Sequence, residues 1–318
     1  MLLTQLIRVG SERVSRMYDE REAREMVFAF LEHQLGTKRH THIIEPEYEV
    51  SDEAASAALA AFDRMATGEP LQYVTGVADF YGRRFRVTPD VLIPRPETEI
   101  LCRSALMQRT GCQVCGNGIL PPPARGRGPR SGRGPLEHLA TVPMILDLCT
   151  GSGCIAWTLA LEMPGAKVTA VDISDDALSV ASSQDFSEET ARTGALAPSF
   201  IKADVLAGPS ASGLTDRFDI LVSNPPYVMD KEKALMRTNV LDHEPHLALF
   251  VSDDDPLVFY RAIADWAQAL LKPGGYAIVE INEALGEETA RIYSDAGFCS
   301  VEIIKDLSDR DRFVSFRR

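Results

Sequence analysis

The stretch "ILDLCTGSGCIAWTLA", residues 145–160, decides the fold of this chain. Its apolar start predicts a buried strand, and the run after Gly153 predicts a helix. The turn Gly151-Ser152-Gly153 between them lets the backbone bend tightly and approach a ligand, and the following helix N-terminus offers free N–H groups. A strand, a glycine turn and a helix in this order predict a ligand site at the end of the strand.

An acidic residue follows at the end of the next predicted strand. Asp172 lies nineteen residues after Gly153, in "VTAVDIS". A carboxylate there can accept both hydroxyls of a ribose, so the two features predict an adenosine-type cofactor. Gly151-x-Gly153-x-x-Ala156 also fits the dinucleotide pattern, and an ordinary strand–helix turn with a solvent-facing acid is a third interpretation. Asp204, which ends the third strand, is either a partner for an adenine amino group or a simple turn residue.

Short β runs and helical runs alternate around this centre from Met144 onward. The predicted strands are 144–149, 167–173, 199–204, 218–223, 276–281, 300–306 and 312–318, and the predicted helices are 153–163, 174–186, 257–271 and 285–296. This alternation predicts an α/β fold with a mostly parallel sheet and helices on both faces.

The rest of the chain predicts a domain division. Residues 1–71 read as a helical domain, in which Ser51 is an expected N-cap and Gly36 an expected helix stop. Residues 72–93, rich in β-branched and aromatic residues, predict a hairpin that joins it to a larger domain, 94–318.

A flexible insertion is expected at 108–142. Its centre, 111–135, holds seven Gly and five Pro and four arginines, which favours a solvated loop over an RNA- or partner-binding segment. Cys112 and Cys115 form half of a zinc pattern without a second pair, so no metal is expected.

Composition limits the class of protein. The 318 residues are 45% hydrophobic and 25% charged, and no apolar run reaches the roughly 20 residues that span a bilayer. The N-terminus does not read as a secretory signal or transit peptide, so the expected location is the cytoplasm. Six scattered cysteines favour reduced thiols. The net charge of −13 disfavours nucleic acid as a direct partner.

The motif "SNPPYVMD", residues 223–230, follows the predicted strand 218–223 at the same sheet edge as the glycine turn. Pro225 and Pro226 have no N–H, so they present rigid carbonyls without a competing donor. A planar –NH2 group could donate one hydrogen to the Asn224 side-chain carbonyl and the other to the Pro225 carbonyl, with Tyr227 as an aromatic wall. Such a site suits methyl transfer to an amide or exocyclic amine by positioning alone, with no general base; a turn that merely ends a strand is the simpler interpretation.

With these motifs, the chain resembles the release-factor glutamine methyltransferase family, the bacterial PrmC/HemK type. The most specific pieces are "GEPLQYVTGVADFYGRRFRVTPDVLIPRPETE", "LDLCTGSGCIA", "AVDIS", "SNPPYV", "EPHLALFV" and "LKPGGYAIVEIN". The resemblance implies a Rossmann-like, seven-stranded domain that uses S-adenosylmethionine to methylate the glutamine side chain of the Gly-Gly-Gln motif in class I peptide chain release factors. It also implies that the N-terminal helices help to grip the release factor, and we expect a monomer.

The resemblance also assigns roles to residues. Asn224, Pro225, Pro226 and Tyr227 would hold the substrate amide, and the cofactor would lie against Cys149, Thr150, Gly151, Ser152, Gly153, Asp172, Asp204, Val205 and Asn224. The stretch 95–99 would line the pocket entrance. Cys149 stands where many members carry a glycine, and Val205 stands at a position that is often aromatic.

Three other functions fit part of the pattern. An adenine-N6 methyltransferase would use the same cradle for an –NH2 group but needs a basic face and a flipped base. A dinucleotide oxidoreductase has no use for Asn-Pro-Pro-Tyr, and a binding module leaves the convergence of the motifs unexplained. The segment 242–246 contains His243 and His246, but Pro245 argues against a helical metal site, and we expect a surface loop near the substrate groove. Glu280 and Asn282 are candidates for a supporting role at the active edge.

Overall fold

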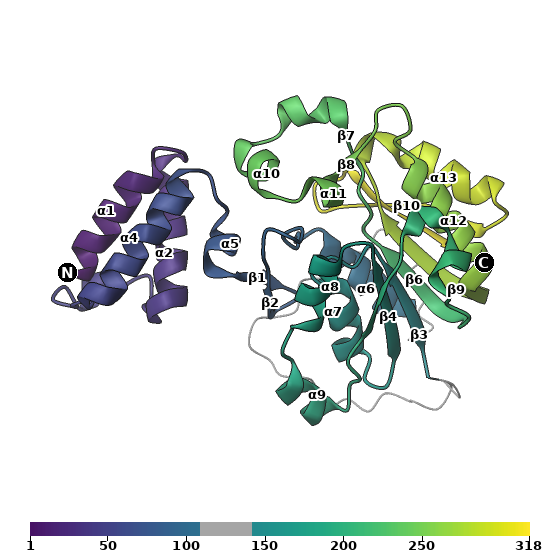
Figure 1. The fold of residues 1–318 in the computed structure, drawn as a ribbon, viewed down its shortest axis with the longest axis horizontal. Helices are drawn as coiled ribbons and strands as arrows, with labels where there is room; N and C mark the ends of the chain where they lie inside the picture. Colours follow the sequence, from purple (N-terminus) through teal and green to yellow (C-terminus); the bar gives the residue numbers. More distant parts are fainter. Residues whose placement is uncertain (109–141) are drawn as a thin grey trace.

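The computed structural model describes residues 1–108 and 142–318 (Figure 1). The N-terminal part is helical, with α1 (Leu3–Val14), α2 (Glu20–Leu35), α3 (Thr41–Ile44), α4 (Asp52–Ala66) and α5 (Leu71–Thr75). The predicted cap is present, because the Ser51 hydroxyl accepts the Ala54 N–H at the start of α4. Gly36 ends α2 in the left-handed region at φ 68°. Helices α1, α2 and α4 enclose an apolar core of their own, in which Phe30 packs edge-on against Phe62.

The predicted hairpin follows these helices. Strands β1 (Val77–Phe80) and β2 (Arg83–Arg86) pair antiparallel around Tyr81 and Gly82, which have φ of 51° and 74°. Phe80 and Phe85 are buried in the same core as Trp157 of the larger unit. The hairpin is therefore packed onto the sheet unit and is not suspended between two bodies. The sequence interpretation did not include the helices on either side of it, α5 and α6 (Thr98–Gln108).

The centre of the molecule is a seven-stranded sheet in the order β10-β11-β9-β6-β3-β4-β5. Its strands are β3 (Met144–Leu148), β4 (Lys167–Asp172), β5 (Ser199–Lys202), β6 (Phe218–Ser223), β9 (Leu271–Glu280), β10 (Cys299–Lys305) and β11 (Asp311–Arg317). Each predicted strand is present. The ladders from β5 to β9 are parallel, and β11 runs antiparallel to both β9 and β10.

Helices cover both faces of the sheet, which confirms the predicted α/β class (Figure 1). They are α6, α7 (Cys154–Glu162), α8 (Asp175–Ser182), α9 (Ser187–Thr193), α12 (Val258–Leu270) and α13 (Gly286–Asp295). The alternation along β3 shows why both faces are covered: Ile145 belongs to one core with α7, and Leu146 to the other with α12. Side chains of a strand point alternately to opposite faces, so a strand with apolar residues on both faces needs a layer on each side.

An excursion of residues 228–251 leaves the sheet after β6 and returns before α12. It contains β7 (Val228–Met229), η3 (Asp230–Leu235), α10 (Thr238–His243), α11 (His246–Leu249) and β8 (Phe250–Val251), and β7 pairs with β8. Three short 3₁₀ turns lie elsewhere: η1 (Val205–Ala207), η2 (Pro209–Ser212) and η4 (Glu283–Leu285). No helix in the described ranges is long and apolar enough to cross a membrane. The predicted insertion core 111–135, with Cys112 and Cys115, lies outside the described residues.

Candidate active site

The glycine turn links β3 to α7 in a left-handed backbone. Cys149, Gly151 and Gly153 have φ of 62°, 55° and 78°. This region is disfavoured for a residue with a side chain, which explains why a glycine is the ordinary choice at the position of Cys149. The Thr150 hydroxyl donates to the buried carboxylate of Asp147 at 2.7 Å and thereby holds the turn against the end of β3.

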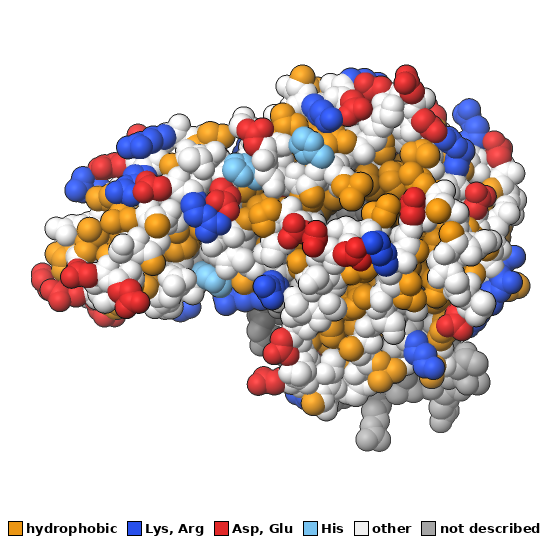
Figure 2. Space-filling view, viewed as in Figure 1, with side chains coloured by type: hydrophobic (Ala, Val, Ile, Leu, Met, Phe, Trp, Pro, Cys, Tyr) orange, Lys and Arg blue, Asp and Glu red, His pale blue; other side chains and the backbone are white. Residues whose placement is uncertain are grey.

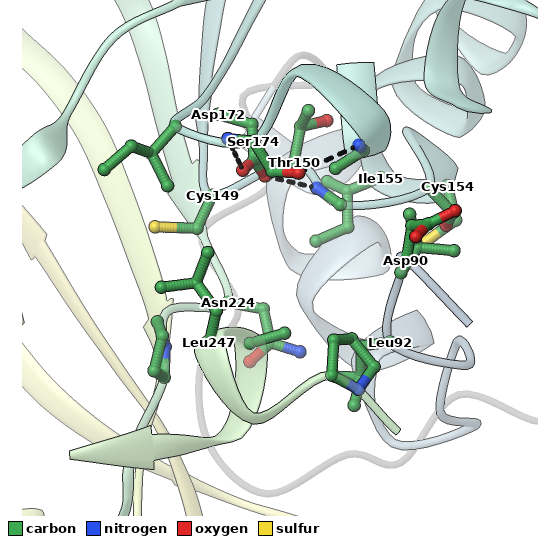
Figure 3. Close-up of a pocket in the computed structure, with 18 of the residues that line it drawn as sticks. Asp90, Leu92, Cys149, Thr150, Cys154, Ile155, Asp172, Ser174, Asn224 and Leu247 are labelled. Carbon is green, nitrogen blue, oxygen red and sulfur yellow. Dashed lines mark hydrogen bonds between the residues drawn. The ribbon is translucent and has the colours of Figure 1, made fainter. Parts of the chain in front are cut away.

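Asp172, at the end of β4, is tied to this turn. Its carboxylate accepts the Gly151 N–H at 2.8 Å and the Ser174 N–H at 3.1 Å. Burial raises the pKa of Asp172, and these backbone donors oppose the increase. The two strand ends are therefore held in one geometry by a single carboxylate. The expected ribose partner lies beside the glycine turn, as Figure 3 shows.

Asn224 lies beside the same turn from the other side. Strands β3 and β6 are parallel neighbours with Leu148 opposite Ser223, and the Ser223 hydroxyl donates to the Leu148 carbonyl at 2.8 Å. The chains that leave these two strands, at Cys149 and Asn224, therefore emerge side by side at the carboxyl edge of the sheet. This edge is where ligands bind in parallel sheets.

A cavity of about 370 Å³ opens at this edge. The predicted site residues that line it are Cys149, Thr150, Gly151, Ser152, Asp172, Asp204, Val205, Asn224 and Pro226 (Figure 3). Gly153 does not line it, because it packs beneath against Ala181 of α8. Pro225 and Tyr227 do not line it either, and the Tyr227 hydroxyl donates to Glu280 at 3.0 Å. The structure thus groups most of the predicted residues around one cavity and places Tyr227 behind it.

Sequence reasoning missed several walls of this cavity. They include Leu92, Ile155, Ser174, Leu247, Ala248 and Phe259. Of the stretch 95–99, Arg95 and Thr98 line the cavity, whereas Glu99 accepts the Tyr81 N–H and pairs with Arg103. Leu92 and Leu247 belong to quoted family pieces, so the signal was present, but nothing in their residue type indicated a cavity.

Two strand-end residues predicted near adenine also have structural partners. The Asp204 carboxylate accepts the Leu206 N–H at 2.8 Å and caps η1. Val205 is buried, and its carbonyl accepts the Trp266 indole N–H at 2.9 Å. Asp204 is therefore a turn residue, as the simpler interpretation predicts, and it also lines the cavity.

A buried carboxylate lies behind Asn224. Glu280, at the end of β9, is 1% exposed and accepts the Thr98 hydroxyl at 2.7 Å as well as the Tyr227 hydroxyl. Asn224 Nδ2 donates to the Thr98 oxygen at 3.3 Å. Burial raises the pKa of Glu280, and the two hydroxyl donors and the positive charge of Arg312 oppose that increase. The supporting role expected for Glu280 thus has a defined hydrogen-bonded path to Asn224.

The segment 242–246 was expected to be a surface loop, but Asp242 and His243 end α10 and His246 begins α11. The residue between these helices that matters most is Glu244. Glu244 is 4% exposed, accepts the Ile93 N–H at 3.2 Å and pairs with Arg95 at 2.6 Å. Through these two bonds Glu244 connects the segment before α6 to the excursion 228–251. A buried charge without a partner is costly, so the pair with Arg95 explains how Glu244 can be buried.

The described cysteines, Cys102, Cys149, Cys154 and Cys299, are free thiols. Nowhere in residues 1–108 and 142–318 do three His, Cys, Asp or Glu side chains gather as metal ligands.

Similarity to family models and to known proteins identifies the family of this chain. A model described as "PrmC N-terminal domain" matches residues 5–76, and one described as "Methyltransferase small domain" matches residues 135–247. A "Release factor glutamine methyltransferase" of Bacteroides thetaiotaomicron is 40% identical over 255 residues, which cover 80% of this chain and 78% of that protein. A protein of the same name from Flavobacterium psychrophilum is 34% identical over 305 residues, 95% of this chain and 94% of that protein.

A solved structure, the release factor-specific protein-(glutamine-N5) methyltransferase from Alicyclobacillus acidocaldarius, is 25% identical, with coverage of 74% of this chain and 99% of that one. Its TM-score of 0.38 is too low to carry the assignment, which rests on the sequence relatives. By their identity and coverage, this chain belongs to the release factor glutamine methyltransferase family.

Proposed function

We propose that the protein transfers a methyl group from S-adenosylmethionine to the side-chain amide nitrogen of the glutamine in the Gly-Gly-Gln motif of class I peptide chain release factors. One observation carries this proposal: the glycine turn after β3 and Asn224 after β6 leave neighbouring strands and line one cavity. The names of the curated relatives agree with this activity.

The cavity suits the cofactor. Cys149 to Gly153 would hold it through the turn, Asp172 would accept the ribose hydroxyls, and Asp204 and Val205 would border the adenine. Bound S-adenosylmethionine supplies an activated methyl group. Burial of Asp172 beside the Gly151 N–H keeps its carboxylate oriented before any ligand arrives. Because Val205 is aliphatic, it would offer the adenine an apolar surface and no aromatic ring for stacking.

The substrate amide would lie against Asn224. Its nitrogen is a poor nucleophile because the lone pair is delocalised. The Asn224 Oδ1 and the carbonyl of Pro225, which lies between the cavity-lining Asn224 and Pro226, would act as two acceptors that orient the nitrogen and draw its protons away. Pro225 and Pro226 contribute no N–H that could compete for these carbonyls. The Tyr227 ring, anchored by its bond to Glu280, would form the wall behind the amide.

The N-terminal domain, residues 1–71, would recognise the release factor. The hairpin segment 72–93 would join it to the catalytic domain, residues 94–318. The guanidinium of Arg237, the residue before α10, lies 3.2 Å from the Glu22 carboxylate of α2, so the excursion beside the cavity meets these helices. Figure 2 shows apolar side chains mixed with charged and histidine side chains along this junction, and Leu247 on the cavity wall is 62% exposed. An exposed apolar side chain beside the cavity suits contact with a protein loop, whereas a phosphate backbone is bound mainly through Lys and Arg. The protein would act as a monomer in the cytoplasm.

The test uses methyl-labelled S-adenosylmethionine and a class I release factor, with a second release factor that carries Gln→Ala in its Gly-Gly-Gln motif. Peptide mass spectrometry should locate the label on that glutamine and find none on the variant. Asn224→Ala should lower turnover by about 100-fold, while cofactor affinity measured by calorimetry changes much less. Label on adenine in added nucleic acid and none on the release factor would contradict the proposed substrate.

A further inference from the structure

A chain of hydrogen bonds runs from Asn224 into the interior. Asn224 Nδ2 donates to Thr98 Oγ1 at 3.3 Å, and Thr98 Oγ1 donates to Glu280 Oε2 at 2.7 Å. The Tyr227 hydroxyl donates to the other oxygen of Glu280 at 3.0 Å. Thr98 is 2% exposed and Glu280 is 1% exposed, so solvent water does not replace these partners. The chain joins α6, β9 and the end of β6.

The number of available protons fixes the direction of each bond. At a pH above its folded pKa Glu280 is an ionised carboxylate, which only accepts, so it takes the single proton of the Thr98 hydroxyl. The Thr98 oxygen is then left with lone pairs and can only accept from Asn224. An asparagine amide donates through Nδ2 alone, which places that nitrogen toward Thr98. The Asn224 Oδ1 is left without a partner among the described residues, on a side chain that lines the cavity.

We propose that Thr98 and Glu280 are positioning residues that hold the Asn224 amide with its oxygen toward the substrate, and that they thereby make the site select a side-chain amide over a carboxylate. This inference rests on the proposed function. Asn224 Oδ1 and the Pro225 carbonyl are both acceptors, so they match the two N–H donors of glutamine. The carboxylate of glutamate would meet two acceptors and no donor, and discrimination of this kind comes from the unfavourable pairing.

The isosteric change Glu280→Gln tests the direction of the chain. An amide at residue 280 has one oxygen, which would keep the Tyr227 hydroxyl bond, and one –NH2 group, which would face Thr98. Thr98 would then accept from residue 280, and its own proton would turn toward Asn224. The Asn224 amide would rotate by half a turn to accept that proton and would present its –NH2 group to the substrate. The shape of the side chain at residue 280 is thus preserved, whereas Asn224 would present a hydrogen-bond donor to the substrate in place of an acceptor.

The experiment measures two quantities for each variant. The first is kcat/KM for methylation of a class I release factor. The second is the ratio of affinities for that release factor and for its Gln→Glu form, by calorimetry with S-adenosylhomocysteine present. Wild type should prefer the glutamine form by about tenfold or more. Glu280→Gln and Thr98→Val should each lower kcat/KM at least about tenfold and bring the affinity ratio toward one, with cofactor affinity nearly unchanged.

Two further variants separate positioning from packing. Thr98→Ser keeps the hydroxyl and should keep the affinity ratio of wild type. Thr158→Val makes the same threonine-to-valine change at a fully buried site in α7, where the hydroxyl has no partner, and should leave both quantities as in wild type. If Glu280→Gln fails to fold, the comparison of Thr98→Val with Thr98→Ser decides the question.

The possible failures are distinguishable. Absence of label on the release factor with wild type would refute the proposed function, and with it the inference. Methylation by wild type together with an unchanged affinity ratio in Thr98→Val and Glu280→Gln would refute the inference alone. A lower kcat/KM with an unchanged ratio would likewise overturn it, since it would show that these residues support packing and not the choice of amide over carboxylate.

Discussion

Gly153→Ala is the sharpest test of how the glycine turn is built. Gly153 has φ 78° and ψ 10°, immediately before α7. A Cβ atom there would lie 3.0 Å from the Ala181 Cβ, 3.3 Å from the Ala181 Cα and 3.2 Å from the Trp157 ring. The change therefore adds two costs, the left-handed backbone and the collision of α7 with the backbone of α8.

Gly194→Ala is the matched control for the first cost. Gly194 has φ 75° and ψ 15° at the end of α9, and a Cβ there would meet nothing within 4 Å. It should lower the free energy of unfolding by about 1–2 kcal/mol, the cost of the left-handed region. Overpacking adds about 1–3 kcal/mol, so Gly153→Ala should cost about 2 kcal/mol more than the control. For a unit of this size the further loss is about 4–8 °C in Tm.

The assay is intrinsic tryptophan fluorescence during urea and thermal unfolding. The chain has 2 tryptophans, Trp157 in α7 and Trp266 in α12, so the signal reports on the sheet unit and not on the N-terminal helices. Equal losses in Gly153→Ala and Gly194→Ala would refute the argument, because the close approach of α7 to α8 would then carry no energy.

Three more predictions follow from the site. Asp172→Ala should weaken S-adenosylmethionine binding at least about tenfold by calorimetry, since it removes the proposed ribose acceptor and the anchor of the Gly151 N–H; unchanged affinity would contradict the proposed role. Glu244→Gln should lower the free energy of unfolding by about 2 kcal/mol in urea, because Arg95 loses its buried partner; a loss below about 0.5 kcal/mol would show that the pair behaves as a surface pair. Burial raises the pKa of Glu280, so the stability that its protonated form contributes is complete below the unfolded pKa of about 4.3 and is lost as pH rises through the higher folded pKa. The stability of wild type relative to Glu280→Gln should therefore fall as the pH rises above the unfolded pKa of about 4.3, and a constant or rising difference would contradict the direction of the pKa shift.

The sheet could be predicted from sequence because its signals are local. Each residue of β3 is apolar or buried on one of two faces, and the turn at Gly151 and Gly153 needs a backbone that glycine adopts readily. The carboxyl ends of parallel strands lie at one edge of a sheet, so the sequence alone predicts that Asp172 and Asn224 lie at the same edge.

The support of the site could not be predicted in the same way. The bonds from Thr98 to Glu280 and from Asn224 to Thr98 join residues that are 182 and 126 positions apart. No sequence periodicity links residues so far apart. The local sequence around a threonine at the start of a helix does not show whether its hydroxyl caps that helix or bonds to a distant side chain. The excursion 228–251 was missed for a related reason, since its elements are short and are held by tertiary contacts.

The ion pair between buried Glu244 and partly exposed Arg95 has a consequence for how the cavity can open. It fastens the chain before α6, including Ile93, to the excursion, so two walls of the cavity cannot separate without exposing a carboxylate that has lost its partners. Ile173 and Leu206, which are 43% and 45% exposed, line the same cavity. Exposed side chains of this kind move within nanoseconds, whereas separation of the two connected segments requires a concerted opening of the fold. A small ligand that exchanges past Ile173 and Leu206 would therefore leave the Glu244–Arg95 pair intact.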